Sequence, residues 1–433
     1  MSLTSLTTTM KILASSLTLI LLHSTVAESN TFPGDIAALK SFLAALDPAS
    51  IPPGSCLASW DFKLDPCSSA FSTHFTCGLR CDATSSDSTS LTFSRITDLS
   101  LDSIGYSGPL SPSIWSLPFL QSLDLSNNRF YGPIPSPLPI SSLPPLLRRI
   151  SLSHNSLSGS IPSFSASPSL EELYLDGNRL SGPFISTSFP SLRRLDLQSN
   201  NFSGSFPDLR SLSNLNFLDL SDNSFSGPFP PDSLPSSLFE LSMRNNLLTG
   251  NLPGSLLASL PLLQVLDLSH NALSGPVPSA AFEHPALEQL ALSGNAFEWV
   301  EEPDEIIASS NMVALDLSHN EISGLLPEFV GSMPQLTAVV LEDNRFTGLI
   351  PTQYAMRAAG IPGAWVAFER LLLGGNYLYG PIPGLMQGMK NGAAAVVSLA
   401  DNCLFRCPEY LYFCAGREQK PAVVCRDFNP MIP

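Results

Sequence analysis

Residues Leu123 to Pro135 read LDLSNNRFYGPIP, and closely related stretches recur through most of the 433-residue chain. Each copy has leucines at alternate positions, then an asparagine, then a glycine and often a proline. The later asparagines mostly lie 22 to 25 residues apart and are Asn155, Asn178, Asn200, Asn223, Asn246, Asn271, Asn295, Asn320, Asn344, Asn376 and Asn402. A degenerate copy around Leu99 and Leu101 precedes the series. A fixed period of this length indicates coils that stack on one another.

The alternating leucines predict a short strand in each copy, with side chains that one copy alone cannot bury. Neighbouring copies must therefore stack into an elongated solenoid. The asparagine amide can both donate to and accept from backbone groups, which predicts a hydrogen-bonded ladder inside the stack. The glycine four residues later suits a positive φ, and the proline ends the hydrogen-bonded segment. We expect strand, turn and extended or 3₁₀ return, with little helix outside the N-terminal cap.

The first 27 residues have the pattern of a secretory signal peptide. Lys11 precedes an apolar run from Ile12 to Leu22, and Thr25-Val26-Ala27 offers small residues for cleavage. No later segment reaches the roughly eighteen continuous apolar residues of a membrane helix, so no membrane span is expected. The sequence predicts a secreted, extracellular protein.

The formal net charge of −16 limits the partners of the chain. Lys and Arg total 21 against 37 Asp and Glu, and no long basic run occurs. This balance argues against nucleic acid or an anionic membrane as the partner. It favours a basic partner instead.

The eight cysteines fall into two groups of four, one before and one after the repeats: Cys56, Cys67, Cys77, Cys81, Cys403, Cys407, Cys414 and Cys425. Since a solenoid exposes its core at both ends, these groups predict caps held by disulfides in an oxidising compartment. A zinc site is the alternative, but the histidine spacing of such sites is missing. Three pairings are open in each cap. We favour nested pairs that include Cys67–Cys77 and Cys407–Cys414.

The stretch that begins DIAALKSFLAALDP at Asp35 and continues to SWDFKLDPCSSAF resembles the N-terminal cap of plant extracellular leucine-rich repeat proteins. The LSGxIP half-repeat is similar to the plant-specific class found in receptor kinase ectodomains, receptor-like proteins and polygalacturonase-inhibiting proteins. The resemblance implies a β-dominated α/β solenoid, a right-handed superhelix with disulfide-stapled caps. It also implies a concave parallel sheet, a second run of short strands beside it, and ligand binding through those surfaces.

This resemblance divides the chain into four regions. They are the signal peptide (1–27), a cysteine-containing N-terminal cap (28–94), about thirteen leucine-rich repeats (95–402) and a cysteine-containing C-terminal cap (403–433).

Two binding functions and no enzymatic one are consistent with the sequence. No nucleophile with a base, phosphate loop or metal motif appears, so we expect no catalysis, cofactor or metal. The first function is a receptor-like component that recognises a peptide or a membrane receptor kinase ectodomain at the plant cell surface. The second is an inhibitor of a secreted wall-degrading enzyme such as polygalacturonase, acting in the apoplast or cell wall.

The third to seventh copies depart from the usual outward Asp and Ser, and this predicts a binding surface on the concave face. Arg149, Glu172 and Arg194 should share one column on adjacent parallel strands. Because Tyr, Phe and Arg are common interface anchors, we expect partner binding there, with a merely solvated ladder as the alternative. The predicted partner-binding residues are Arg149, Glu172, Tyr174, Arg194, Asp196, Phe217, Asp219, Phe239 and Arg244.

Two interruptions of the period add further hypotheses. Between Asn344 and Asn376 the chain inserts TQYAMRAAGIPGAWV, an elaborated loop whose aromatic residues Tyr354 and Trp365 we expect to be exposed and to make a second contact. The ninth copy replaces its Gly-Pro return with FEWVEEPDEII. Its acidic residues could attract a cation or a basic partner, or form a solvated loop; they are Glu298, Glu301, Glu302, Asp304 and Glu305.

A single N-glycosylation sequon, Asn201-Phe202-Ser203, directly follows the ladder asparagine Asn200. We therefore expect a glycan at Asn201, where the turn leaves the strand.

Overall fold

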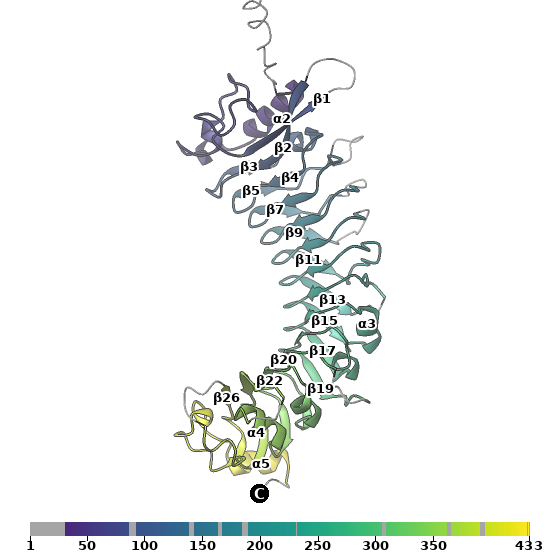
Figure 1. Ribbon diagram of the computed structural model, residues 1–433, viewed down its shortest axis with the longest axis vertical. Coiled ribbons are helices and arrows are strands. Elements are labelled where there is room, and N and C mark those ends of the chain that lie inside the picture. Colours follow the sequence, from purple (N-terminus) through teal and green to yellow (C-terminus); the bar gives the residue numbers. More distant parts are fainter. Residues whose placement is uncertain are drawn as a thin grey trace, which may run out of the picture.

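A computed structural model describes residues 31–85, 92–137, 143–162, 167–183, 189–230, 232–304, 309–361, 365–389, 395–430 and 432. In this part of the chain, stacked coils form one elongated arc, with α2 (Pro33–Ala44) near its N-terminal end and α5 (Ala422–Phe428) near its C-terminal end (Figure 1). The predicted signal peptide lies outside the described residues.

One strand from each coil joins the long sheet, which has fourteen strands in the described residues. Its first strand, β1 (Leu79–Ser85), is antiparallel to β2 (Thr92–Ser100). Each later coil adds one parallel strand, in the order β4 (Ser122–Asp124), β6 (Arg149–Ser151), β8 (Glu172–Tyr174), β10 (Arg194–Asp196), β12 (Phe217–Asp219), β14 (Glu240–Ser242), β16 (Val265–Asp267), β18 (Gln289–Ala291), β20 (Ala314–Asp316), β22 (Ala338–Val340), β24 (Arg370–Leu372) and β26 (Val396–Ser398). This stack is the solenoid that the repeat predicts.

A second strand follows the asparagine turn of most coils and joins one of two flank sheets. The nine-stranded flank sheet contains β3 (Ser107–Pro109), β5 (Arg129–Gly132), β7 (Ser156–Gly159), β9 (Arg179–Gly182), β11 (Asn201–Gly204), β13 (Ser224–Pro228), β15 (Leu247–Gly250), β17 (Ala272–Val277) and β19 (Ala296–Val300). The four-stranded flank sheet contains β21 (Ser323–Leu325), β23 (Arg345–Gly348), β25 (Tyr377–Pro381) and β27 (Cys403–Phe405). The flank therefore breaks between β19 and β21.

Helices are few and short in the returns, as the sequence predicts. The α-helices of the returns are α3 (Gly254–Ser259) and α4 (Thr352–Ala358). The 3₁₀ helices are η1 (Pro48–Ser50), η2 (Leu57–Ser59), η3 (Pro112–Ser116), η4 (Ser279–Ala281), η5 (Glu328–Ser332) and η6 (Tyr412–Cys414).

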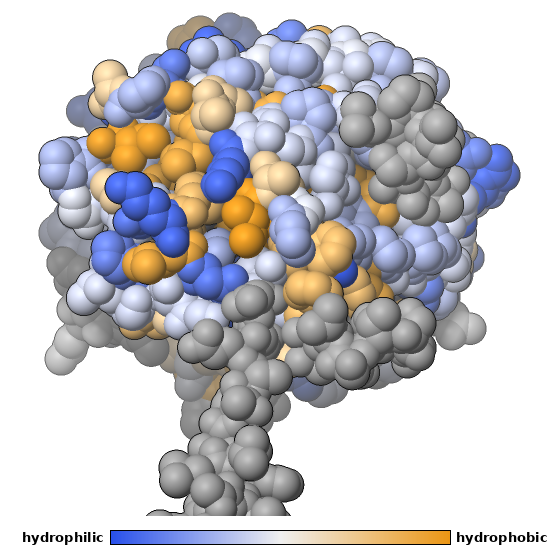
Figure 2. Space-filling view, turned by 90° about the horizontal axis from the view of Figure 1, so that it is seen from above, coloured by the Kyte–Doolittle hydropathy of each residue, from blue (hydrophilic) through white to orange (hydrophobic). Residues whose placement is uncertain are grey.

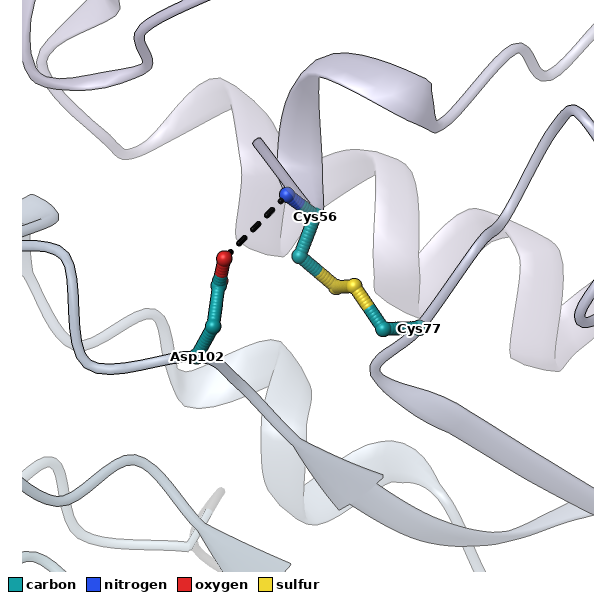
Figure 3. Close-up of side chains that lie close together, drawn as sticks. All are labelled: Cys56, Cys77 and Asp102. Atoms are coloured by element: carbon teal, nitrogen blue, oxygen red, sulfur yellow. Dashed lines mark hydrogen bonds between the residues drawn. A yellow bond between two sulfur atoms is a disulfide. The ribbon is translucent and has the colours of Figure 1, made fainter. Parts of the chain in front are cut away.

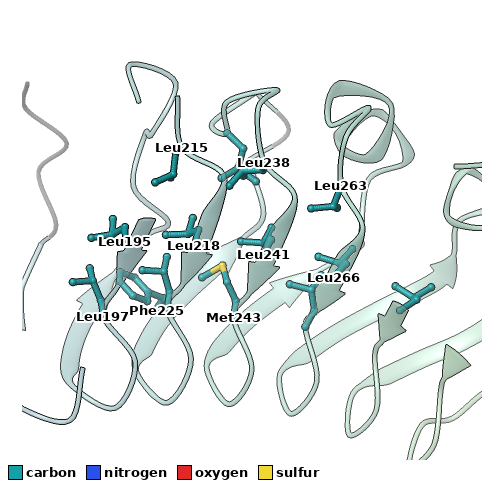
Figure 4. Close-up of a cluster of buried hydrophobic side chains, with 14 of the residues drawn as sticks. Leu195, Leu197, Leu215, Leu218, Phe225, Leu238, Leu241, Met243, Leu263 and Leu266 are labelled. Atoms are coloured by element: carbon teal, nitrogen blue, oxygen red, sulfur yellow. The ribbon is translucent and has the colours of Figure 1, made fainter. Parts of the chain in front are cut away.

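The core is a continuous set of leucine rows between the long sheet and the returns. In Figure 4, Leu195, Leu218, Leu241 and Leu266 project from adjacent strands into the same layer. Each of the four is at most 1% exposed. Burying a leucine side chain contributes about 1.5–3 kcal/mol, so the repeated rows stabilise the stack coil by coil.

The ladder asparagines hold each coil to the one before it. Asn223 Nδ2 donates to the carbonyl of Leu197 in the preceding coil at 3.0 Å. It also donates within its own coil, to Leu220 at 3.1 Å and Ser221 at 2.9 Å. Its Oδ1 accepts from the Phe202 N–H at 3.0 Å. Because the same pattern recurs at the neighbouring ladder asparagines, the predicted ladder is confirmed.

The turn around most ladder asparagines uses left-handed backbone at two positions. Gly227, four residues after Asn223, has φ 89°, as the sequence predicts. The residue immediately before the asparagine also has positive φ, as at His270 with φ 55°. The His270 ring lies over the equivalent position of the next coil, where a Cβ on Gly294 would lie 2.6 Å from Nδ1. A glycine there makes room for the ring.

The N-terminal cap is joined to the stack by a buried ion pair. Asp35, in the first turn of α2, accepts from Arg95 on β2 at 2.9 and 3.0 Å and from the Ile96 N–H at 3.1 Å. Asp35 is 1% exposed, so a buried charge is matched by a buried partner. This contact fixes α2 over the open end of the long sheet.

The disulfides of the N-terminal cap join Cys56 to Cys77 and Cys67 to Cys81. The predicted Cys67–Cys77 pair is therefore wrong. Trp60 Nε1 donates to the Cys77 carbonyl at 3.2 Å, which places Cys77 beside the helical turn that carries Cys56. Cys81 lies on β1 instead and reaches Cys67. Packing of the cap outweighs the preference for the shorter loop.

The C-terminal cap has nested disulfides, Cys407–Cys414 inside Cys403–Cys425, as expected. The outer pair links β27 to α5. The Phe428 ring at the end of α5 stacks on Tyr377 of β25, with ring centroids 3.7 Å apart. This helix therefore covers the last strands of the four-stranded flank sheet.

Seen from the N-terminal end, the molecule shows apolar side chains gathered in one region among charged ones (Figure 2). The exposed apolar residues of the cap include Phe71, which is 71% exposed, and Leu64, which is 41% exposed. Phe71 has φ 59°, and its N–H donates to the Phe75 carbonyl at 2.9 Å. The cap loop is thus a tight turn that carries an aromatic side chain outward.

Candidate binding surface

The outward residues of the long sheet form columns because its parallel strands pair in register. Arg149, Glu172 and Arg194 are Cα partners on β6, β8 and β10, as predicted, and Phe217 on β12 continues the column. Arg149 and Glu172 form an ion pair. Burial acts to lower the pKa of Arg149, but the hydrogen bonds and charges of Glu172 and Tyr174 together outweigh it, so the pKa is raised overall.

Two arginines and two aromatic rings alternate across this surface. The Arg149 guanidinium carbon lies 4.5 Å from the Tyr174 ring centroid. Arg194 lies 5.8 Å from the same ring and 4.9 Å from the Phe217 ring. We call Arg149, Tyr174, Arg194 and Phe217 the cation–aromatic row. Each contact stabilises by about 0.5–1 kcal/mol at an exposed site, so the row orders four side chains before any partner arrives.

Acidic side chains border the row on the same coils. Asp196 follows Arg194 by two residues and lies between Asp176 and Asp219 of the adjacent coils. Burial, followed by the charge of Asp176 and that of Asp219, raises the pKa of Asp196 to about 6, while Arg194 opposes the shift. A cationic group placed here would relieve the repulsion between these carboxylates, which makes the border a cation-accepting one.

Asp219 has the same local role as other aspartates of the repeat. Its Oδ1 accepts from the Ser221 N–H at 2.9 Å, and Asp267 makes the same bond to Ser269 at 2.9 Å. The carboxylate thus stabilises the turn after the strand. Among the described contacts, none joins Asp219 to the cation–aromatic row. Its predicted role in partner binding therefore depends on its position beside Asp196 on the adjacent strand.

Phe239 and Arg244 lie on the coil of β14, next to the row. Phe239 directly precedes the strand, and its N–H donates to the Asn216 carbonyl at 2.8 Å. Arg244 is exposed two residues after the strand. Among the described side-chain contacts, none joins these two residues to the cation–aromatic row. They remain predicted partner-binding residues.

The expectation of an exposed Tyr354 is wrong. Tyr354 is 0% exposed because α4 packs against η5, and its hydroxyl donates to the Pro327 carbonyl at 3.0 Å. Burial raises the pKa of Tyr354 well above its ordinary value. Trp365 at the other end of the insertion is 51% exposed. Of the two aromatics, only Trp365 can meet a partner.

Arg357 on α4 is the charged residue that the sequence analysis missed. Its side chain is buried, with 1% exposure, and burial lowers its pKa to about 10. Its guanidinium group donates to the carbonyls of Gly331, Met333, Leu336 and Val366. The insertion therefore serves the fold, because it supplies donors to backbone acceptors that no strand or helix satisfies.

The described residues offer no open metal site. Cys56, Cys77 and Asp102 are the one metal-like cluster within the described ranges, and Figure 3 shows the two sulfurs joined in a disulfide. Asp102 accepts from the Cys56 N–H at 3.5 Å and from the Tyr106 hydroxyl at 2.6 Å. Since disulfide sulfurs are not thiolates, this cluster ties the cap together and does not bind an ion.

Asn201, the predicted glycosylation site, is exposed at the start of β11, next to the buried Phe202. A glycan on its amide would project from the nine-stranded flank sheet. The position is accessible, and the modification remains a prediction.

Family models for leucine-rich repeats match the regions that the period predicts. One model matches residues 236–297, and another matches 119–139, 146–167, 169–189, 191–212, 214–234 and 311–333. The protein has the leucine-rich repeat fold. A comparison with curated proteins gave no match for this leucine-rich repeat chain.

Solved structures show that the leucine-rich repeats are of the plant type. A TDR receptor structure is 26% identical with a TM-score of 0.59, and covers 72% of this chain and 53% of that one. The plant peptide hormone receptor RGFR1 in complex with RGF2 is 25% identical, with a TM-score of 0.59 and the same coverages. The Arabidopsis HAESA ectodomain with an extended IDA peptide hormone is 30% identical, with a TM-score of 0.56, covering 69% and 52%.

The leucine-rich repeat chain spans about half the length of these receptor structures. Among its described helices, none combines the length and apolar character needed to cross a bilayer. The cap disulfides and the likeness to receptor ectodomains together indicate an extracellular, ligand-binding protein.

Proposed function

We propose that this protein is a secreted receptor-like component of the plant apoplast or cell wall, which binds a peptide or a receptor ectodomain through the outward face of β6 to β14. The observation that carries the proposal is the cation–aromatic row. Its four side chains contact one another on adjacent strands of a rigid sheet and remain half-buried.

The physical properties of the row support binding over a solvated role. Tyr, Phe and Arg lose little conformational entropy on binding when they are already ordered against one another. The two arginines can pair with partner carboxylates, and Asp196 and its neighbours can accept a cationic group. A peptide or protein segment that carries both charges beside an apolar residue fits this pattern.

The comparisons support a peptide as the ligand class. The RGFR1 and HAESA structures that this chain resembles are described as complexes with peptide hormones. The proposal of a secreted protein includes the division into a signal peptide (1–27), two caps (28–94 and 403–433) and the repeats (95–402). It also includes a glycan at Asn201.

The proposal can be tested by peptide capture. Immobilised protein with intact disulfides is incubated with peptides from plant apoplastic fluid, and bound peptides are identified by mass spectrometry and then titrated as synthetic copies. Arg194→Glu with Phe217→Ala should weaken binding at least tenfold, because the row loses one cation and one ring. Equal affinity for the variant and the original protein would disprove the assignment.

Arg370→Glu is the matched control. Arg370 occupies the same column on β24, far along the stack, and is exposed. This variant makes the same charge reversal and should leave the affinity unchanged. Adding the protein to a polygalacturonase tests the other function: hydrolysis of pectin should continue, and inhibition would identify an inhibitor instead.

A further inference from the structure

The break between the two flank sheets leaves a hollow on the side of the solenoid. β19 pairs with β17 on one side, and β21 pairs with β23 on the other, but β19 and β21 are not paired as strands in the described residues. Hydrogen bonds join them near their starts: the N–H of Glu321, two residues before β21, donates to the Phe297 carbonyl of β19 at 3.0 Å. The Ser323 hydroxyl donates to the Glu298 carbonyl at 3.3 Å, so a side chain and not a backbone N–H satisfies this carbonyl.

The sequence of the ninth copy explains why the strands separate. Where other copies have Gly-Pro, this copy continues as Trp299 and Val300, and β19 is drawn towards β17 with a register shift opposite Gly275 and Pro276. The Glu301 N–H then donates to the Val277 carbonyl at 3.0 Å, on the β17 side. Residues 301–304, the described part of the acidic segment, therefore continue along β17 and do not pair with β21.

The resulting groove has a volume of about 720 Å³ and two walls. Val300, Glu302, Pro303 and Asp304 line one wall, and residues 323–329 and Ser332 line the other together with Phe346 of the neighbouring β23. The volume falls in the range of roughly 300–1,000 Å³ that is typical of ligand sites. We call it the flank groove.

The flank groove combines apolar side chains with acidic groups that form no ion pair in the described residues. Leu325 is 71% exposed although it belongs to a strand, and Phe329 is half-buried. Glu302, Asp304 and Glu328 are exposed on its rim, and no ion pair in the described residues neutralises them. Such a surface matches alternating basic and aliphatic side chains.

We propose that the flank groove binds a basic, extended segment of a partner protein, which adds as a strand between β19 and β21 where they diverge beyond Glu298 and Ser323. Strand addition at an open sheet edge provides backbone hydrogen bonds, and the alternating side chains provide selectivity. The aliphatic side chains cover Leu325 and Phe329, and the basic side chains pair with the acidic rim. This site is separate from the cation–aromatic row, so either proposal can fail alone.

The probe is the synthetic peptide Ac-VKVRVKV-NH₂, with Ac-VEVEVEV-NH₂ as its acidic counterpart, titrated against the full disulfide-bonded protein by calorimetry. The basic peptide should bind, and the acidic one should not. A copy of the basic peptide with alternate N-methylated peptide bonds should bind at least tenfold more weakly, because one edge of the peptide strand then lacks N–H donors. No binding of the basic peptide, or equal binding of its N-methylated copy, would overturn strand addition.

The groove variant is Glu302→Lys with Asp304→Lys and Glu328→Lys. The matched control is Glu409→Lys with Glu418→Lys and Asp427→Lys, three exposed acids of the C-terminal cap, which changes the net charge equally. Affinity should fall at least tenfold in the groove variant alone; equal loss in both would show unspecific charge attraction and disprove the site. Leu325→Ser, at an exposed position that leaves the fold intact, should also weaken binding.

Discussion

At the scale of single residues, the ladder asparagines are where sequence and structure agree most closely. Asn295 lies in the irregular ninth copy, yet its amide donates to Leu268 and Leu292, each at 3.0 Å, as Asn223 does to its own partners. Asn223→Ala and Asn295→Ala should therefore each cost about 1–3 kcal/mol of unfolding free energy, because each leaves buried backbone groups without a partner.

Urea unfolding of protein made without glycans measures both losses. Asn201→Ala is the matched control, since Asn201 is exposed and should change stability by less than about 0.5 kcal/mol. A much smaller loss at Asn295 than at Asn223 would show that the irregular return does loosen the ladder.

Asp196 gives a residue-scale prediction about pH. Its folded-state pKa is raised from 3.8 to about 6, first by burial and then by Asp176 and Asp219. Between these two values the folded state binds a proton that the unfolded state has released, so this group lowers stability as pH rises through the window. Asp196→Asn should stabilise the protein more at about pH 7 than at about pH 4, measured as paired unfolding curves. An equal effect at both pH values would contradict the pKa shift.

At the scale of elements, α4 shows what repeat patterns cannot predict. The length of the insertion is evident from the period, but the burial of Tyr354 and Arg357 depends on buried carbonyls in and beside η5. The sequence does not show that these carbonyls lack backbone donors; only the folded structure does. The sequence therefore predicted a partner-binding loop, whereas the insertion supplies hydrogen-bond donors to backbone carbonyls of the fold.

Arg357→Met should destabilise the protein by about 3 kcal/mol or more, because three buried carbonyls and a partly buried one lose their donor. Arg357→Lys should recover only part of that loss, since an ammonium group cannot reproduce the planar fork. Arg345→Met, which removes an exposed ion pair with Glu321, is the control and should cost less than about 1 kcal/mol. Calorimetric and chemical unfolding that find Arg357→Met within that same limit would refute the role given to α4.

The long sheet and its columns could be predicted from the sequence for a clear physical reason. Each strand pairs with the same register, so Arg149, Glu172 and Arg194 align once the repeats are aligned. The row itself could not be predicted, because stacking of Tyr174 between two guanidinium groups depends on side-chain rotamers. The acidic wall of the flank groove was evident in the interrupted ninth copy, but the groove itself could not be predicted, because it depends on the register shift of β19.

At the scale of the whole molecule, the caps protect the two apolar ends of the stack. All described cysteines are paired, and removing a native disulfide costs about 2–5 kcal/mol. Reductant should therefore lower the unfolding temperature. Peptide mapping without reductant should recover Cys56–Cys77, Cys67–Cys81, Cys403–Cys425 and Cys407–Cys414. A linked Cys67–Cys77 peptide would contradict the arrangement of the N-terminal cap.

The central claim is that a peptide or receptor ectodomain binds the outward face of the long sheet over the cation–aromatic row. Hydroxyl-radical footprinting of the protein, with and without the captured peptide, tests it most directly because aromatic side chains react readily. Tyr174 and Phe217 should lose oxidation on binding, while Tyr410, which is 85% exposed in the C-terminal cap, should not change. Unchanged oxidation of Tyr174 and Phe217, with protection confined to the flank sheets or the caps, would contradict the claim.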